Sequence, residues 1–276
     1  MSEYEDYTST SRSYDQTRSA TGVEVILGCI GACVPLGDAV VLDAGCGSGN
    51  YAAAVAPRVG HLIGVDLNEA MLGRARDKLE GAVREGRAEF HQGDLRELPV
   101  ADAAVDAVMI NQVLHHLPEE DGGDWPHRRQ VLAEVARVLR PGGVLVINTC
   151  LRRQLEAGYW FMALIPEVRE KLAARHPDAA VYRGLLADCG LSYQGRIVPL
   201  DAVLQGDSYH DPLGPLSASW REGDSAWALA SPAELERALA TLEELRAQDR
   251  AGQFHAQHDA GRHEVGQITF LHARRD

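Results

Sequence analysis

Short apolar runs alternate with longer amphipathic stretches between residues 23 and 150. A short continuous apolar run is typical of a strand covered on both faces of a sheet. Such runs predict strands at 40–45, 61–67, 88–95, 105–114 and 144–150. Apolar positions recur at helical spacing in the stretches between them, which predicts helices at 23–34, 52–59, 68–79 and 127–143. This alternation predicts right-handed crossovers and a doubly wound, mostly parallel sheet.

The alternation weakens after residue 150, where helices are predicted at 156–176, 179–192 and 231–248, and strands at 193–204 and 263–275. Ser231 and Glu234 form a capping box at the start of the last helix, with Pro232 at its first position. Residues 205–230 are rich in Gly, Pro, Ser and aromatic residues, which predicts a long inserted loop or lid. We expect the final strand to be antiparallel, at one edge of the sheet.

The formal net charge of −13 argues against DNA or RNA as a partner, because nucleic-acid affinity depends on attraction to phosphates. The polar, acidic N-terminus does not resemble a signal peptide, and no stretch has the length and hydrophobicity of a membrane span. Five scattered cysteines are typical of reduced cytosolic thiols. We therefore expect a cytoplasmic protein without a membrane or nucleic-acid partner, and the sequence leaves its oligomeric state open.

The end of the first predicted strand raises the main functional question, because VVLDAGCGSGN has almost no side chains after its acid. Its spacing, Asp43-x-Gly45-x-Gly47-x-Gly49, differs from the G-x-G-x-x-G pattern that surrounds a dinucleotide pyrophosphate. It is also not a P-loop, since no Lys-Ser/Thr pair follows. A glycine turn at this place lets a ligand approach the backbone closely and tolerates positive φ. Asp43 either orients this turn, touches the ligand or caps backbone amides, and Cys46 fits the tight turn.

The next strands end in groups that suit a nucleoside. Asp66 ends the second strand, where a carboxylate accepts hydrogen bonds from ribose hydroxyls. Gly93, Asp94 and Leu95 end the third, where an acid beside apolar walls suits the adenine amine. The fourth ends in Asn-Gln-Val-Leu-His-His, residues 111–116. A nucleoside site without a phosphate cradle, beside an acidic turn, indicates a cationic adenosine ligand.

These segments, DAGCGSGN, GVDLN, GDL, INQVLHHL and VLRPGGVLVI, resemble in order the motifs of class I S-adenosylmethionine-dependent methyltransferases, and most of all the small-molecule branch with ubiquinone-biosynthesis-type enzymes. The resemblance covers about residues 38–150. It implies S-adenosyl-L-methionine as cofactor, with the methionine moiety along Gly45, Gly47 and Gly49 and the ribose on Asp66. It further implies adenine contacts from Leu67, Met71, Asp94 and Leu95, and a floor made by Asn111 and Gln112.

The resemblance also implies a Rossmann-like α/β fold with a seven-stranded sheet. We expect one methyltransferase-like domain over residues 1–276. It would consist of an N-terminal flap and helix at 1–37, the cofactor-binding core at 38–150, and a substrate-side half at 151–276 with the lid insertion at 205–230. In the segment SYDQTRSATGVE, Arg18 would pair with the cofactor carboxylate and Tyr14 would cover the sulfonium; the alternative is a solvent-facing arm.

Four residues are candidates for the reaction centre. His115 and His116 follow the fourth strand, and one of them is either a general base or a group that packs on adenine or caps the next helix. Asn148 follows the fifth strand and binds a substrate group or pins a loop. Tyr182, with Tyr159, Trp160 and Phe161, forms an acceptor pocket or belongs to the core. The remaining histidines, at 210, 255, 258 and 263, match no ligand spacing, so no metal is expected.

Three functions remain open from the sequence. The first is methyl transfer to oxygen, nitrogen or carbon of a small molecule; the fourth strand lacks the Asn/Asp-Pro-Pro-Tyr motif of enzymes that act on nucleobase or glutamine amide nitrogens. The second is cyclisation of S-adenosylmethionine itself with release of methylthioadenosine, as in azetidine-2-carboxylate synthases, so that no other substrate exists. The third is a non-catalytic S-adenosylmethionine-binding protein.

Overall fold

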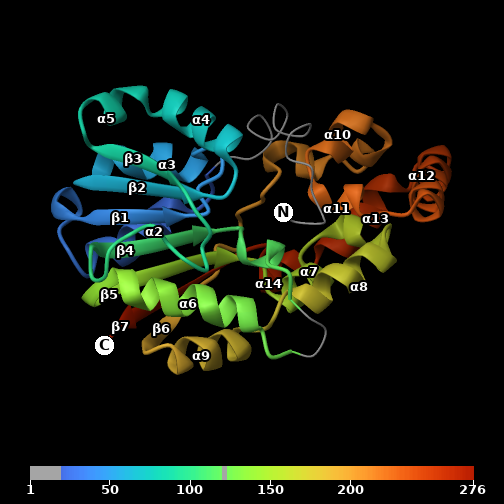
Figure 1. Ribbon diagram of the computed structural model, residues 1–276. Helices are drawn as coiled ribbons and strands as arrows, with labels where there is room; N and C mark the ends of the chain where they lie inside the picture. Colours follow the sequence, from blue (N-terminus) through green and yellow to red (C-terminus); the bar gives the residue numbers. More distant parts are fainter. Residues whose placement is uncertain (1–19, 120–122) are drawn as a thin grey trace. The chain divides into compact units, whose positions relative to one another are not determined.

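The computed structural model describes residues 20–119 and 123–276, so the predicted flap residues Tyr14 and Arg18 lie outside the described residues. The chain divides into two compact units (Figure 1). The sheet unit consists of residues 22–149, 179–197 and 269–276. The helical unit consists of residues 150–178 and 198–268, together with the described residues 20–21. The division does not follow the predicted boundary at residue 150, because two later segments belong to the sheet unit.

The sheet unit contains a seven-stranded sheet in the order β3-β2-β1-β4-β5-β7-β6. The strands are β1 Val40–Ala44, β2 His61–Asp66, β3 Ala88–Gln92, β4 Val105–Asn111, β5 Leu139–Thr149, β6 Leu191–Ile197 and β7 Thr269–Arg275. Strands β1 to β5 pair in parallel, and β7 is antiparallel to both β5 and β6. The predicted Rossmann-like α/β fold is confirmed, and the C-terminal strand is antiparallel as predicted. Its predicted place at the edge is wrong, because β7 pairs with both β5 and β6 and β6 forms the edge.

The helices of this unit are α2 Val23–Gly31, α3 Asn50–Val55, α4 Glu69–Lys78, α5 Glu80–Arg84, α6 Pro126–Val138 and α9 Ala179–Asp188. Short 3-10 turns are η1 Leu36–Asp38, η2 Ala56–Arg58 and η3 Leu114–His116. The crossovers β1-α3-β2 and β4-α6-β5 run in opposite directions along the sheet, so right-handed connections put α3 and α6 on opposite faces. Helix α2 contacts α3, and α6 contacts α9. The sheet is therefore covered on both faces, which explains why its central strands are mostly apolar.

Helix α6 ends earlier than predicted, at Val138 rather than in the Pro-Gly-Gly segment. Leu139 is already extended, with φ −65° and ψ 140°, and begins β5. Pro141 disfavours helical backbone at the residue before it and cannot donate a backbone hydrogen bond, so a helix cannot run on through this segment. The pairing with β4 shifts here, because Val105 pairs with Leu139 but Ala107 pairs with Val144.

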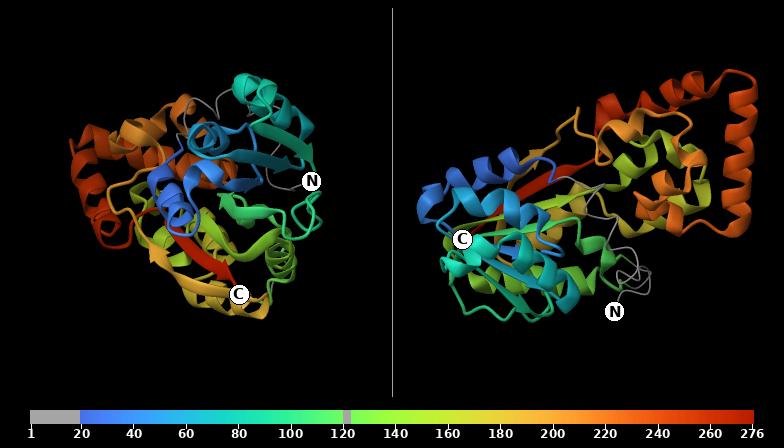
Figure 2. Two further views of the ribbon diagram at one scale, coloured as in Figure 1. Left: turned by 90° about the vertical axis from the view of Figure 1, so that its left-hand side faces the viewer. Right: turned by 90° about the horizontal axis from the view of Figure 1, so that it is seen from above.

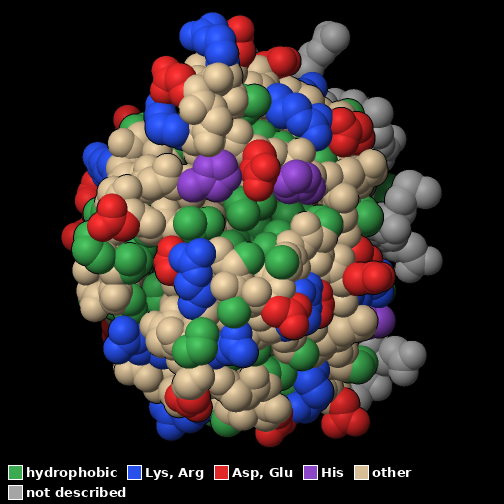
Figure 3. Space-filling view, turned by 60° about the vertical axis from the view of Figure 1, so that its left-hand side comes forward, with side chains coloured by type: hydrophobic (Ala, Val, Ile, Leu, Met, Phe, Trp, Pro, Cys, Tyr) green, Lys and Arg blue, Asp and Glu red, His purple; other side chains and the backbone are tan. Residues whose placement is uncertain are grey.

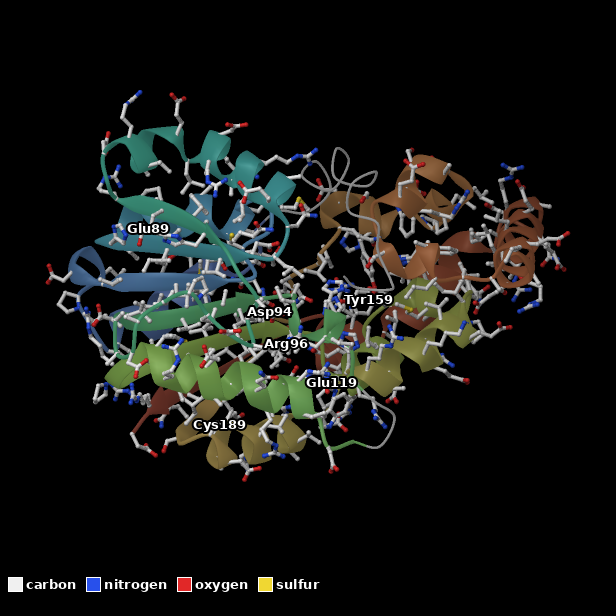
Figure 4. All side chains as sticks on the ribbon, viewed as in Figure 1. Glu89, Asp94, Arg96, Glu119, Tyr159 and Cys189 are labelled. Carbon is white, nitrogen blue, oxygen red and sulfur yellow. The ribbon has the colours of Figure 1, made fainter. Side chains whose placement is uncertain are left out.

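The edge strand β3 carries polar side chains on its outer positions. Nε2 of His61 and Nε2 of His91 lie 3.7 and 3.5 Å from Oε1 of Glu89. Figure 3 shows histidine side chains beside an acidic one on one face of the molecule, and Figure 4 shows Glu89 on β3. Charged side chains on an edge strand disfavour pairing with another chain.

The helical unit contains α7 Arg152–Ala157, η4 Trp160–Ala163, α8 Pro166–Arg175, η5 Gly206–His210, η6 Gly214–Leu216, α10 Ala218–Glu222, α11 Ser225–Ala228, α12 Pro232–Ala247, α13 Ala251–Asp259 and α14 Arg262–Val265. Helices α12 and α13 meet at a steep angle (Figure 2). The segment 205–230, predicted as a loop or lid, therefore holds four short helical elements. No helix in residues 20–119 and 123–276 combines the length and hydrophobicity needed to cross a bilayer.

The predicted capping box at α12 forms only in part. Oγ of Ser231 accepts a hydrogen bond from the backbone N–H of Glu234 at 3.1 Å, and Pro232 is the first helical residue, as predicted. The Glu234 carboxylate is buried, and its Oε1 accepts from the backbone N–H groups of Glu167 and Val168 at 2.7 and 3.3 Å. Glu234 therefore caps the neighbouring helix α8, whose first N–H groups need acceptors.

We expect Glu234→Ala to lower the free energy of unfolding by about 1–3 kcal/mol, because it removes a buried acceptor from two backbone N–H groups. Urea unfolding monitored by tryptophan fluorescence measures this loss. Glu236→Ala, which removes an exposed acid from the same helix, is the matched control and is expected to change little. Equal effects of the two substitutions would contradict the capping role.

Candidate functional site

The predicted site residues gather where the parallel strands of the sheet unit end. Strands β1, β2, β4 and β5 run in the same direction, so their carboxyl ends form one edge of the sheet. In open α/β sheets this edge is where ligands bind. The glycine turn follows β1, Asp66 ends β2, Asn111 ends β4 and Asn148 lies near the end of β5.

The three glycines of the turn after β1 all have positive φ, of 81°, 52° and 81° at Gly45, Gly47 and Gly49. A Cβ on Gly45 would lie 2.6 Å from Cγ2 of Val113, and a Cβ on Gly49 would lie 2.9 Å from Cβ of Ala75. These two glycines therefore serve packing as well as backbone conformation. A Cβ on Gly47 would meet no atom of residues 20–119 or 123–276 within 4 Å, so the described part of the chain leaves open space at that position.

The Asp66 carboxylate holds two turns together. Its Oδ2 accepts a hydrogen bond from the Gly47 N–H at 2.8 Å, and its Oδ1 accepts from the Asn68 N–H at 2.9 Å. Asn68 in turn caps α4, as its Oδ1 accepts from the N–H groups of Ala70 and Met71. Burial raises the pKa of Asp66, and the backbone donors oppose that rise by stabilising the ionised form. A carboxylate has about four acceptor positions, so Asp66 keeps capacity for ligand hydroxyls.

Asp43 and Asn111 lie side by side on β1 and β4, and both are buried. Nδ2 of Asn111 donates to Oδ1 of Asp43 at 3.4 Å. Among the described residues, Oδ2 of Asp43 and Oδ1 of Asn111 are buried acceptors without a hydrogen-bond partner. Burial and the charge of Asp66 together raise the pKa of Asp43 to about 7, against the opposing effect of hydrogen bonds from Asn111 and the Ala52 backbone. Two buried unpaired acceptors at a strand end are costly unless a donor reaches them, which marks this position as one that suits a cationic group.

The third strand supplies an acid that already has a partner. Oδ2 of Asp94 accepts from Nη2 of Arg96 at 2.6 Å, and Oδ1 accepts from the Arg96 backbone N–H at 2.8 Å (Figure 4). Arg96 lowers the pKa of the Asp94 carboxyl. Nε of Arg96 also donates to Oδ1 at 3.0 Å and to Oδ2 at 3.2 Å, so at most about one acceptor position of the carboxylate remains. The predicted contact of Asp94 with an adenine amine stays a prediction.

The apolar residues predicted around adenine differ in exposure. Leu67 is 50% exposed directly after Asp66, whereas Met71 and Leu95 are buried. An exposed leucine at a strand end is an apolar surface available to a flat ligand. A Cβ on Gly93 would lie 2.7 Å from Cδ of Pro99, so this glycine allows the chain to pack closely. Cys46 is buried, and burial raises its thiol pKa, which leaves it neutral as a packing residue.

The carboxyl ends of β4 and β5 are joined by a polar network that includes one residue absent from the predictions. Nε2 of Gln112 donates to Oδ1 of Asn148 at 3.0 Å, and Nδ2 of Asn148 donates to the hydroxyl oxygen of Tyr51 at 2.8 Å. Tyr51 lies in the first turn of α3, immediately after the glycine turn. Its position directly after the glycine turn is the one sequence feature that could have identified it. His115 and His116 follow on η3, with their rings 4.0 Å apart.

The remaining candidates lie in packed regions. Tyr182 is buried in α9, the helix that contacts α6 and β6. In the helical unit, Trp160 and Phe161 are fully buried and contact each other edge to face. They belong to an aromatic cluster whose further members are Tyr159, Tyr209, Trp220, Trp227, Phe254 and His255. Within the part of the chain that the structure describes, no group of His, Cys, Asp and Glu has the arrangement of a metal site.

The comparisons with known proteins agree with this geometry. A methyltransferase domain family model matches residues 42–147. A probable S-adenosylmethionine-dependent methyltransferase of Mycolicibacterium smegmatis is 39% identical over 109 residues, which are 40% of this chain and 37% of that protein. The 27-O-demethylrifamycin SV methyltransferase of Amycolatopsis mediterranei is 35% identical over 119 residues, covering 43% and 41%. The matches thus span well under two thirds of these relatives.

Solved structures show the same fold over most of the chain. A putative methyltransferase from an antibiotic biosynthesis pathway of Anabaena variabilis has a TM-score of 0.72 at 20% identity, covering 94% of this chain and 99% of that one. A geranyl diphosphate C-methyltransferase of Streptomyces coelicolor has a TM-score of 0.57 at 16% identity, covering 92% and 75%. Residues 42–147 thus match a methyltransferase domain model, and the chain as a whole shares the fold of these solved structures.

The raised pKa of Asp43 predicts a pH-dependent stability. The pKa is about 7 in the folded protein, against an ordinary value of 3.8. Between these values the folded protein holds a proton that the unfolded chain has released, so the free energy of unfolding falls as pH rises from about 4 to about 7. We expect this residue to contribute a loss of up to about 4 kcal/mol.

Asp43→Asn removes the titration, so the stability of the variant relative to wild type should increase from pH 4.5 to pH 8. Urea unfolding at several pH values measures the difference between the two curves. Asp38→Asn, at an exposed acid just before β1, serves as the control. A constant difference between Asp43→Asn and wild type at all pH values would count against a raised pKa.

Proposed function

We propose that the protein binds S-adenosyl-L-methionine at the carboxyl ends of β1, β2 and β4 and transfers its methyl group to a small molecule. The observation that carries this proposal is the pair of unpartnered buried acceptors, Asp43 Oδ2 and Asn111 Oδ1, beside the open space at Gly47. This arrangement fits a ligand that carries an ammonium group on a chain narrow enough to pass along the glycine turn. The methyltransferase names of the relatives support the same activity.

In this proposal, different residues of the sheet unit contact different parts of the ligand. Asp66 accepts from the ribose hydroxyls, Leu67 and Met71 flank the adenine, and Asp94 with Leu95 meets its amine edge. Gly45, Gly47 and Gly49 allow the backbone to lie against the methionine moiety, with Gln112 at the floor. When bound, S-adenosylmethionine supplies a methyl group activated by a neighbouring sulfonium. The chain's contribution is to hold the acceptor in line with that methyl group and to exclude water.

The acceptor atom is oxygen, nitrogen or carbon, and the two histidines of η3 are the proposed titratable groups on the acceptor side. A neutral imidazole at His115 or His116 would take the proton from an acceptor that is not yet ionised. An acceptor that is already ionised needs no general base and only has to be positioned correctly. Residues 151–276, with the segment 205–230, are the proposed source of acceptor recognition. The cytoplasm, with its S-adenosylmethionine, is the proposed location.

Binding of S-adenosylmethionine tests the first part of the proposal. We expect saturable binding by calorimetry, and we expect Asp66→Ala to weaken it by about 1–3 kcal/mol because ribose hydroxyls lose their acceptor. Asp77→Ala, at an exposed acid of α4, is the control. Since Asp66 also holds the glycine turn, circular dichroism and a thermal melt should accompany the measurement. No saturation with well-folded wild-type protein would overturn the proposal.

The products test the second part. The protein is incubated with S-adenosylmethionine, first alone and then with a panel of phenols, carboxylates and amines, and nucleosides are identified by mass spectrometry. S-adenosylhomocysteine that forms only with an added acceptor supports methyl transfer. Methylthioadenosine above the spontaneous background without an acceptor contradicts it and indicates cyclisation. Binding without any product across the panel contradicts turnover and indicates a binding protein.

A further inference from the structure

The side chain of Tyr51 spans the ends of three neighbouring strands. Tyr51 belongs to α3, which follows β1, and its hydroxyl oxygen lies 2.8 Å from Nδ2 of Asn148 on β5. Strand β4 lies between β1 and β5 in the sheet. The phenol ring must therefore cross the carboxyl end of β4 to reach Asn148. Tyr51 is half-buried, so part of its surface is accessible at this edge.

The Asn148 side chain is hydrogen-bonded at both atoms of its amide. Its Oδ1 accepts from Nε2 of Gln112 at 3.0 Å while its Nδ2 donates to Tyr51, and the residue is 1% exposed. Asn148 therefore links Gln112 to Tyr51.

The backbone of Gln112 is held in a conformation that side chains rarely adopt. Its φ is +54°, and its N–H donates to the backbone oxygen of Asn148 at 2.8 Å. A left-handed residue with a Cβ is unfavourable and persists where surrounding structure imposes it, often at functional sites. With this backbone conformation, the Gln112 side chain reaches Asn148, and the hydrogen bond between the two side chains completes the network.

We propose that Tyr51 is a further ligand-contacting residue, and that Asn148 and Gln112 are the residues that position its hydroxyl against the amino-acid half of the ligand. This inference rests on the proposed function. The adenosine half is assigned to the ends of β2 and β3, through Asp66 and Leu67. The other half leaves the glycine turn on its opposite side, toward β4, where the Tyr51 ring lies. Asn148, predicted as a candidate catalytic residue, is on this view a positioning residue.

Two nucleosides that differ in the amino-acid half separate this role from a structural one. S-adenosylhomocysteine carries that half, and methylthioadenosine lacks it. Calorimetry with each nucleoside is carried out on wild type, Tyr51→Phe and Gln112→Gly. We expect Tyr51→Phe to bind S-adenosylhomocysteine about 3- to 10-fold more weakly, the usual effect of losing one hydrogen bond, and methylthioadenosine with unchanged affinity. Tyr193→Phe, which removes a phenol hydroxyl from β6, is the matched control.

Gln112→Gly separates positioning from stability. Glycine adopts φ +54° without strain, so the melting temperature should stay the same or rise, while binding of S-adenosylhomocysteine weakens. Combining Tyr51→Phe with Asn148→Ala should weaken binding no more than the stronger single substitution, because both act through one network.

Equal weakening of both nucleosides in Tyr51→Phe, unchanged binding of both, or additive effects in the double variant would overturn the role of Tyr51. A wild-type protein that binds neither nucleoside would instead overturn the proposed function.

Discussion

The arrangement of the site depends on one half-buried carboxylate. Asp66 accepts hydrogen bonds from backbone N–H groups on two separate turns, at Gly47 and at Asn68. The first belongs to the glycine turn after β1, and the second begins α4. Burial opposes ionisation of Asp66, while backbone donors favour the ionised form. Because the same carboxylate fixes both turns, the position of the first strand end is tied to that of the second before any ligand binds.

Four residues at this edge of the sheet have a left-handed backbone conformation. Gly45, Gly47 and Gly49 have positive φ after β1, and Gln112 has positive φ after β4. The glycines adopt this conformation at little cost, whereas Gln112 needs compensation from its hydrogen bonds to Asn148. Chain direction changes sharply at these points, so backbone and short side chains, rather than bulky residues, line the edge. Such an edge admits a ligand close to the backbone.

Local patterns predicted the elements of the sheet unit and the residues of the glycine turn and the strand ends. The apolar runs located all strands of the sheet. The start of β5 at Leu139 was not predicted, because apolar residues keep their helical spacing into this segment although Pro141 prevents the helix from continuing. Contacts between distant segments were not predictable: Tyr51 and Asn148 are 97 residues apart, and Glu234 accepts from the backbone N–H of Glu167, 67 residues earlier in the chain. Such contacts depend on strand order and helix packing, which a single sequence does not encode in any local pattern.

The acids of the site explain why a cationic ligand suits it. Asp43 and Asp66 each have a raised pKa from burial, and the charge of Asp66 raises the pKa of Asp43 further. Ionising both without a counter-charge is unfavourable, so the ligand-free site favours a proton on Asp43 near neutral pH. A bound cation supplies the missing counter-charge and favours release of that proton. Part of the attraction for a cationic nucleoside would then come from relief of repulsion between two acids that the fold already holds together. A nucleoside without an ammonium group supplies no such counter-charge, so the acids would discriminate between nucleosides that carry the amino-acid half and those that lack it.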